Sequence, residues 1–502
     1  MRQRNFPLYF KIAITFFCFV SLVVETNAMV ADTAFIKTYG GINSEVFKDI
    51  VQVGDSGFIL AGYTNSYGNG SNSVYVVRVK KDGTHIWSKT VGGPGTDFAN
   101  SMSKDTSGNI FIAGTTSSYG AGGYDGYLIK MDTAGTISWE KTFGGVDWDF
   151  LNSVKVMPDQ SILLAGESYS FSGGGSDAWV LHLNTNGDTT WTHHYGNFGN
   201  DAFKGIELSS TAIYLTGYLD STNAARKDGL LVKLDYDGNL IYQLRKNNEG
   251  NDFLNGSLIL LNNNLLIYGS TTAIDSTQSD YWIEELDTNG VSQWVQNSYL
   301  PQNDYFNKII SISNNRLLAV GQLDPSGFGR SSMFALVTNA FGFYYDSHSF
   351  GGTNDEEGSN VIRTVDGGLA FVGFTTSYGV ANKDAMLVLL RSDTSVTPNL
   401  VYNNVTYFET LSPIGVMELN SQSDISVFPN PALSSIYIQS KENKAIGRIE
   451  LTDLIGKILI ESSDRNLGLK KLDVTTITET GIYLLKIFSA GEWLVRRIEI
   501  IR

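Results

Sequence analysis

Cysteine is almost absent from this sequence of 502 residues. Its single cysteine, Cys18, lies inside an apolar run near the N-terminus. No disulfide can therefore form within the chain, and the remainder offers no thiol for catalysis and no thiolate ligand for zinc. The fold must be stabilised by packed secondary structure.

Histidine is also scarce, with five residues in the whole chain. His193 and His194 are adjacent in a predicted strand, so their side chains point to opposite faces and cannot share one site. The sequence lacks the H-E-x-x-H, G-x-S-x-G and phosphate-loop motifs. These absences argue against an enzyme. A pair of carboxyl groups acting on a polysaccharide is left open, because the sequence does not reveal how far apart they lie.

Basic residues are outnumbered by acidic ones. The chain has 36 Lys and Arg against 51 Asp and Glu, which gives a formal net charge of −15. Residues 424–502 are close to neutral, so the excess lies in the part before them. An acidic surface repels phosphate backbones, which excludes nucleic acid as a favoured partner.

Long hydrophobic runs are confined to the N-terminus. Three basic residues precede the apolar run Ile12–Val24, and small residues ending at Ala28 follow it. This pattern predicts a secretory signal peptide over residues 1–28. The run is short for a bilayer span and no later segment qualifies, so no transmembrane segment is expected.

One unit of about 52 residues recurs seven times between residues 29 and 393. Its clearest copy runs from Asp97 to Gly145. An acidic residue marks each copy: Glu45, Asp97, Asp149, Asp201, Asp252, Asp304 and Asp355. A glycine after an apolar run keeps the same interval: Gly62, Gly114, Gly166, Gly217, Gly269, Gly321 and Gly373. Regular repeats of this length are typical of solenoids, propellers and arrays.

Each unit predicts four short strands and no helix. In the clearest copy these are Phe98–Lys104, Ile110–Ala113, Tyr127–Met131 and Ile137–Phe143, separated by turns rich in Gly and Asp. The seventh unit lacks its fourth strand, and an unpaired equivalent lies at residues 34–41. We therefore expect an all-β fold: a seven-bladed β-propeller over residues 29–393 whose N-terminal strand closes the last blade.

The acidic residues are expected to be mainly architectural. A residue present in every blade serves the scaffold, and these carboxylates could accept backbone N–H groups where a loop meets the next blade. A second column, Asp125, Asp177, Asp228, Asp280 and Asp384, becomes Ser73 and Ser332 in two blades. No calcium-loop motif accompanies either column, so no metal site or cofactor is predicted, although calcium stays possible.

A tryptophan column is also expected to pack the blades together. It comprises Trp87, Trp139, Trp191 and Trp294, with Phe35, Gln243 and Tyr345 in the other copies. With their Gly-Gly doublets, residues 33–391 resemble the secreted bacterial propeller repeats called SBBP or delta-60 type. That resemblance implies a propeller and no defined activity.

Aromatic residues that break the sevenfold pattern are better candidates for function. One loop position carries Tyr67, Tyr119, Phe171 and Tyr378, in blades that become neighbours once the ring closes, and Trp148 occupies a position that is mostly Asn or Thr elsewhere. Both loop types fall on the same face of a propeller. Such rings can stack on sugars or bury against a protein, so we predict a glycan- or protein-binding arc. The alternative is that they pack against their own loops.

The last 79 residues have a different character. Val427-Phe428-Pro429-Asn430-Pro431 opens the segment, Leu451–Lys457 contains Gly456, and Gly481–Ile487 contains Tyr483. These ordered motifs resemble the type A C-terminal sorting domain of the type IX secretion system of Bacteroidetes. The resemblance implies a small Ig-like β-sandwich over residues 424–502, joined by a linker over residues 394–423, and the secretion machinery as a partner.

Three functions remain open, one of which is a structural stalk or matrix component that binds nothing selectively. Of the other two, the first is a secreted or cell-surface binding or adhesion protein without enzymatic activity. The second is an extracellular hydrolase that acts on polysaccharide with acidic side chains on the propeller face. The missing nucleophile motifs favour the first.

Overall fold

The computed structural model describes the chain in two units, one within residues 1–413 and one within residues 414–502. The described residues are 30–31, 33–220, 226–247, 250–272, 278–297, 303–313, 315–323, 331–379, 382–390, 399–400, 406–410, 425–428, 434–440, 445–452, 457–462, 466–467, 469–478, 481–489 and 492–500. The predicted signal peptide, residues 1–28, lies outside them.

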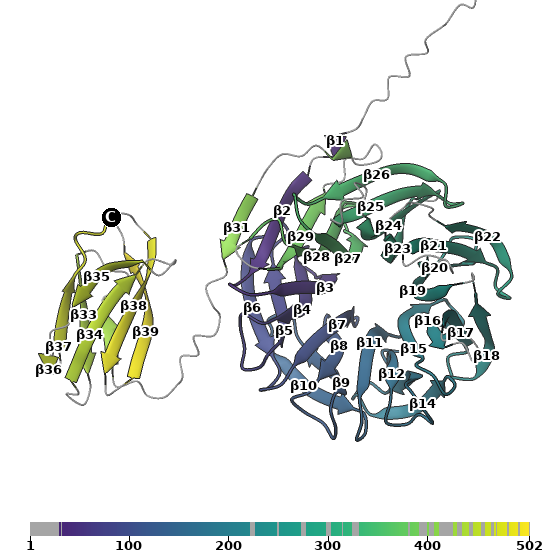
Figure 1. Ribbon diagram of the computed structural model, residues 1–502, viewed down its shortest axis with the longest axis horizontal. Coiled ribbons are helices and arrows are strands. Elements are labelled where there is room, and N and C mark those ends of the chain that lie inside the picture. The colour runs from purple at the N-terminus through teal and green to yellow at the C-terminus, as the bar shows by residue number, and fades with distance from the viewer. Residues whose placement is uncertain are drawn as a thin grey trace, which may run out of the picture. The chain divides into compact units, whose positions relative to one another are not determined.

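The first unit is a ring of seven sheets, each built on four antiparallel strands (Figure 1). Blades one to three are β3 (Glu45–Gln52), β4 (Phe58–Thr64), β5 (Ser73–Val79), β6 (His85–Val91); β7 (Asp97–Lys104), β8 (Ile110–Thr116), β9 (Asp125–Met131), β10 (Ile137–Phe143); and β11 (Asp149–Val156), β12 (Ile162–Ser168), β13 (Asp177–Leu183), β14 (Thr189–Tyr195). Blades four and five are β15 (Ala202–Leu208), β16 (Ile213–Asp220), β17 (Lys227–Leu234), β18 (Leu240–Lys246); and β19 (Asn251–Ile259), β20 (Leu265–Thr272), β21 (Ser279–Leu286), β22 (Ser292–Asn297). Blades six and seven are β23 (Tyr305–Ser313), β24 (Arg316–Leu323), β25 (Ser332–Asn339), β26 (Tyr344–Phe350); and β27 (Glu356–Arg363), β28 (Leu369–Thr375), β29 (Asp384–Leu390), β2 (Thr33–Gly40). The predicted seven-bladed architecture is confirmed.

The burial of each strand follows its place in the blade. Every residue of β8 is buried, because a middle strand is covered on both faces by neighbouring blades, whereas β10 at the outer edge alternates between half-buried and exposed positions. This explains why the second strand of a unit is a continuous apolar run and the fourth alternates.

The glycine column has a specific steric cause. The register of each first strand shifts by one residue, as between Leu151 and Ser153 of β11, and the column glycine of the second strand lies opposite. A Cβ atom on Gly166 would lie 1.8 Å from the carbonyl oxygen of Phe150. Each blade repeats this β-bulge, so the position accepts only glycine.

The tryptophan column joins successive blades. The ring of Trp139, at the outer edge of blade two, lies over Gly187 in the tight turn of blade three, where the backbone has φ +79°. Trp87, Trp191 and Trp294 cover Gly135, Gly238 and Gly342 in the same way, and Phe35 covers Gly83. The prediction that this column packs the blades is confirmed.

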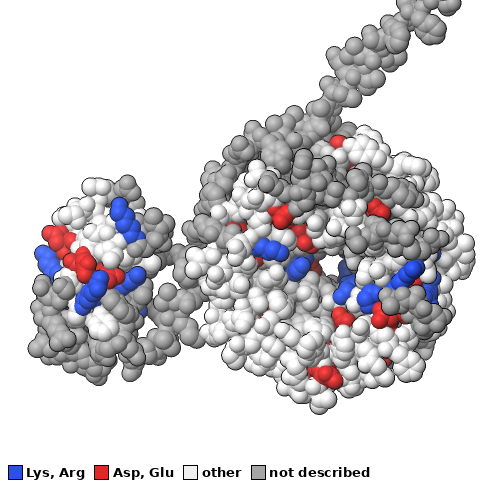
Figure 2. All heavy atoms as spheres, in the orientation of Figure 1, with Lys and Arg blue, Asp and Glu red and all other residues white. Residues whose placement is uncertain are grey.

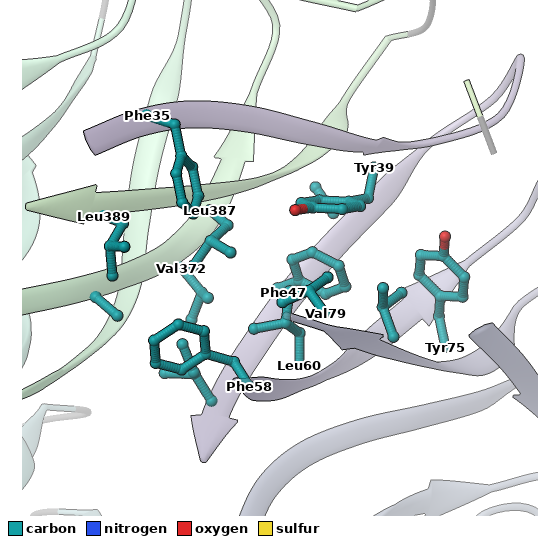
Figure 3. Close-up of a cluster of buried hydrophobic side chains, with 14 residues drawn as sticks. Phe35, Tyr39, Phe47, Phe58, Leu60, Tyr75, Val79, Val372, Leu387 and Leu389 are labelled. Atoms are coloured by element: carbon teal, nitrogen blue, oxygen red, sulfur yellow. The ribbon is translucent and has the colours of Figure 1, made fainter. Parts of the chain in front are cut away.

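The ring closes through its N-terminal strand. β2 pairs antiparallel with β29, which completes blade seven as the sequence predicts. Figure 3 shows the core at this seam, where Phe35 and Tyr39 of β2 meet Phe47 and Phe58 of blade one and Leu387 of β29. Closure covers the edge that β29 would otherwise expose.

The segment expected to be a plain linker contributes strands as well. β31 (Thr406–Thr410) pairs parallel with β2 as a fifth strand of blade seven, and β30 (Asn399–Leu400) pairs with β1 (Val30–Ala31). These strands were not predicted, because they are short and carry no repeat pattern.

The second unit consists of two sheets around one core. One contains β32 (Ile425–Phe428), β33 (Ser435–Ser440) and β37 (Leu469–Asp473); the other contains β34 (Ala445–Thr452), β35 (Ile458–Ser462), β36 (Asn466–Leu467), β38 (Gly481–Ser489) and β39 (Glu492–Ile500). Ile438 of the first sheet and Leu485 of the second lie in the same buried cluster. Among the predicted sorting residues, Gly481 begins β38 and Tyr483 is buried in this core, whereas Pro429, Asn430, Pro431 and Gly456 lie outside the described residues.

Candidate binding face

One face of the propeller carries both variable loop types. The loop between the second and third strands of a blade lies beside the loop that leads from that blade into the next: the backbone N–H of Ser71 donates to Gly95 O at 3.0 Å, for example. We call this side the loop face. The opposite side carries the tight turns between first and second and between third and fourth strands.

Buried carboxylates hold the loop face together. Asp149 accepts hydrogen bonds from the backbone N–H of Gly145 at 2.8 Å and from the hydroxyls of Ser168 and Ser170. Asp97 makes the equivalent contacts with Gly93 N, Thr116 and Ser118. Both are fully buried. The acidic column is therefore architectural, as expected, because each carboxylate fixes the loop that enters its blade.

One member of that column was assigned wrongly. In blade seven the buried carboxylate is Glu356, which accepts from Gly352 N at 3.1 Å and from Thr375 Oγ1 at 2.8 Å. The predicted member, Asp355, is exposed and accepts from Ser331 N, as Asn200 does from Ser176 N in another blade. The error arose because adjacent acidic residues fit the repeat equally well.

In the second acidic column, Asp125 holds a loop and Asp228 pairs with Arg245. Asp125 is buried and its Oδ2 accepts from the backbone N–H groups of Ala121 at 3.2 Å and Gly122 at 3.4 Å. Burial raises the pKa of Asp125 above its usual range. Within the described residues, no group of three His, Cys, Asp or Glu side chains is arranged to hold a metal ion.

Two of the predicted arc residues form hydrogen bonds between blades. The hydroxyl of Tyr67 donates to Gly40 O at 2.8 Å, and that of Tyr378 donates to Gly351 O at 2.7 Å. Each links a loop to the end of the preceding blade. Burial raises the pKa of the Tyr67 hydroxyl, as does the nearby charge of Glu45. These two rings are half-buried within the loop layer.

The other three predicted residues present their rings to solvent. Tyr119, Trp148 and Phe171 are 44%, 51% and 55% exposed. They belong to blades two and three and to the loop between them. Three of the five predicted arc residues are therefore exposed on loops of the loop face, whereas Tyr67 and Tyr378 take supporting roles.

Trp148 stands on a base of other aromatic rings. Its ring lies 5.8 Å from Tyr124 at an interplanar angle of 89°, and 6.4 Å from both Phe150 and Tyr169. Tyr169 also donates its backbone N–H to Trp148 O at 2.9 Å. These contacts fix the orientation of a tryptophan that leaves half of its surface free for a ligand.

Two further apolar side chains on the same loops were not predicted from the sequence. Val146 is 82% and Phe198 is 87% exposed. The Phe171 ring approaches Gly145, next to Val146, and the Phe198 backbone lies against Gly174, in the same loop as Phe171. Both occupy a loop position that carries Ile42, Pro94 and Thr353 in other copies, and Ile42 is also exposed. We call Tyr119, Val146, Trp148, Phe171 and Phe198 the apolar patch.

The histidines of blade three are packing residues. His182 and His193 stack on Trp191 with ring centroids 5.2 and 5.1 Å away, and His194 stacks on Trp179 at 6.0 Å. The two adjacent histidines therefore occupy opposite faces of the sheet. Burial lowers the pKa of His182 and His194, which keeps these rings neutral near pH 7.

Family models match both units. A secretion-system C-terminal sorting domain matches residues 426–501, a β-propeller repeat of the SBBP type matches residues 86–120, and a β-propeller domain of unknown function, DUF5122, matches residues 59–84. No protein of curated function matches the sequence significantly.

Solved structures resemble the chain only distantly. Sqt1 from Chaetomium thermophilum has 9% identity and a TM-score of 0.40, covering 72% of this chain and 99% of that one. The β-propeller domain of the Trilobed protease from Pyrococcus furiosus has 8% identity and a TM-score of 0.35, covering 79% and 94%. Endo-arabinase from Bacteroides thetaiotaomicron has 10% identity and a TM-score of 0.29, covering 49% and 94%.

The sorting domain implies export to the cell surface or the extracellular space through the secretion machinery. In the described part of the chain, no helix is long and apolar enough to cross a membrane. The first unit is a seven-bladed β-propeller with SBBP- and DUF5122-type repeats, and the second carries the C-terminal sorting domain of the type IX secretion system.

Proposed function

We propose that this protein is a non-enzymatic binding protein of the cell surface or surroundings, which recognises a glycan with the apolar patch of its loop face. Residues 1–28 act as the signal peptide that delivers the chain to the sorting step. The charge and apolar run of that segment support this role.

The observation that carries the proposal is the exposure of the patch. Monomeric proteins seldom leave neighbouring large apolar side chains in water unless they contact something else. Phe198 and Val146 gain nothing from the fold where they stand, since more than four-fifths of each is exposed. Four of the five patch residues are aromatic, and flat rings supply the stacking surface that the apolar faces of sugars need.

The loops around the patch add polar groups at short range. Asp147 and Ser170 flank Val146 and Phe171 in the sequence, and Asp147 N already donates to Ser170 Oγ at 3.0 Å, which holds the two loops together. A preorganised platform with hydrogen-bonding groups at its rim suits an extended polar ligand, because little ordering is needed on binding.

The hydrolase alternative receives less support. The most regular acidic residues of the loop face are buried beneath the loops, where they accept hydrogen bonds from the protein itself. A carboxyl group engaged in this way is not free to protonate a leaving group or to activate water.

The proposal is tested with an array of bacterial and plant polysaccharides probed with the full mature chain. Trp148→Ala and Phe198→Ala should each weaken glycan binding about tenfold, which corresponds to about 1.4 kcal/mol. Phe198→Ala is not expected to disturb folding, because this side chain is almost fully exposed.

Phe341→Ala provides the matched control. This ring is 60% exposed but lies in a tight turn on the opposite side, so its loss should leave glycan binding unchanged. Binding that survives both patch substitutions, or no binding to any glycan, would reject the proposal and direct attention to a protein partner.

A further inference from the structure

The first strands of all seven blades surround a central channel. β3, β7, β11, β15, β19, β23 and β27 form its wall (Figure 1), and a cavity of about 350 Å³ lies inside it. Lys and Arg side chains adjoin the opening in the middle of the ring (Figure 2). The cavity is lined by five lysines, Lys48, Lys104, Lys155, Lys204 and Lys308, against one acidic residue, Asp49. This excess of positive charge contrasts with the net charge of −15 of the whole chain.

The bulge position shows that two of these lysines, Lys48 and Lys204, are exceptions to the repeat. Four blades carry asparagine at the bulge, and each side-chain amide donates to a backbone carbonyl of the next blade, as Asn152 does to Phe203 O at 2.8 Å. Asn100, Asn255 and Asn307 repeat the contact with Leu151, Phe306 and Gly358. Lys48 and Lys204 occupy this position in blades one and four. A scaffold that is complete with asparagine does not need lysine there.

Two of the five lysines have partners. Lys104 Nζ donates to Gln52 O at 2.7 Å, and Lys204 Nζ lies 3.7 Å from Glu167 Oε1. By contrast, Lys48, Lys155 and Lys308 form no hydrogen bond or ion pair with any other residue that the structure describes.

The acidic residues near these lysines do not neutralise them. Asp49 is buried, and its carboxylate accepts hydrogen bonds from Met102 N at 2.6 Å, from Ile50 N at 2.7 Å and from Asn360 Nδ2. Glu207 lies within electrostatic range of Lys155 but forms no ion pair with it in the described structure. Burial, together with the nearby charge of Lys308, lowers the pKa of Lys155. The like charges of Lys155 and Lys308 therefore interact, and the acidic groups in range, Asp49 and Glu207, form no ion pair with Lys155 or Lys308 in the described structure.

We propose that the channel is a binding site for a small oxyanion with two or more negative charges, held by Lys48, Lys155 and Lys308. Carboxylate and phosphate groups offer the acceptors that ammonium groups require, and such an ion would offset the repulsion between the lysines. The cavity has the size of a small-molecule site. This site is separate from the apolar patch and does not depend on the proposed glycan.

The test uses the full mature chain with citrate and inorganic phosphate as separate probes, and sodium chloride at matched ionic strength as the reference. Binding is measured by calorimetry and by the rise in Tm that a ligand of the folded state produces. We expect saturable binding of at least one probe, with affinity reduced tenfold or more in Lys155→Met and in Lys308→Met. The stronger probe identifies the site as selective for carboxylate or for phosphate.

Lys80→Met is the control. Lys80 is exposed on the opposite side from the loop face, so this variant should bind the probes as the wild type does. In the absence of oxyanion, Lys155→Met should unfold at the same temperature as the wild type or above it, because a repelling charge is removed. The proposal fails if neither probe binds more strongly than chloride, if the lysine variants retain full affinity, or if Lys155→Met lowers Tm without any probe present.

Discussion

Glu356 shows how a single buried carboxyl group can make the stability of the propeller depend on pH. Desolvation raises its pKa above the ordinary value of 4.5, although Thr375, Ser377 and Gly352 supply hydrogen bonds. In the range just above 4.5 the folded protein therefore binds more protons than the unfolded chain. The free energy of unfolding contributed by this group must fall as the pH rises through that range.

The prediction compares wild type with Glu356→Gln by urea unfolding between pH 4 and about pH 7. The wild type should lose stability relative to the variant as the pH rises, because only the wild type has this group to deprotonate. Asp355→Asn, which changes the exposed neighbour, controls for the loss of a negative charge in the same loop. Parallel curves for wild type and Glu356→Gln would show that Glu356 titrates normally.

Residue roles on the loop face were only partly predictable. Trp148 was identified because it breaks the repeat, and its exposure agrees with a binding role that still awaits its test. Tyr67 and Tyr378 occupy the same repeat position as the exposed Tyr119 and Phe171, yet their hydroxyls bond to the preceding blade. The sequence could not separate these cases, because exposure depends on the loop that packs alongside.

Among the elements, the tight turn of each blade depends on the ring that covers it. A Cβ atom on Gly187 would lie 2.9 Å from Cη2 of Trp139, and the residue has φ +79°. Both the backbone conformation and the contact with the preceding blade exclude a side chain.

Gly187→Ala should therefore lower the free energy of unfolding by about 1–3 kcal/mol, measured by urea or thermal unfolding. Gly54→Ala is the matched control, since no atom lies within 4 Å of a Cβ at that position and its φ is not in the left-handed region. Equal effects of the two substitutions would mean that neither the backbone conformation nor the tryptophan contact constrains this position.

The strand pattern itself was predictable from one unit. The expected strand Ile137–Phe143 is β10 without change, and the other three differ from β7, β8 and β9 by a few terminal residues. Alternation and turn glycines act locally, so they are visible in the sequence. The strands β30 and β31 were missed because they form by pairing with distant strands rather than by a pattern of their own.

For the whole molecule, the part of the chain that completes the ring and the part that directs export end at different residues. β31 extends blade seven to Thr410, so a truncation at the predicted propeller boundary, residue 393, would remove a strand of the ring. A truncation after Ser423 keeps that strand and removes only the unit that matches the sorting domain.

We expect a chain that ends at Ser423 to fold and to remain in the periplasm, because it lacks the signal for the outer-membrane step. Cell fractionation and surface labelling measure this outcome, and full-length Phe198→Ala should still reach the surface. Undiminished surface display of the truncated chain would refute the assignment of export to residues 424–502.

The sequence by itself determined the number of blades, the strands within them, the closing strand and the sorting domain. Those features depend on periodic residues and ordered motifs, which are local properties of the chain. The tertiary structure decided which carboxyl group is buried in blade seven, which aromatic rings reach solvent, and that lysines from separate blades share one channel. These properties arise from contacts between residues far apart in the sequence, and such contacts exist only after the ring has closed.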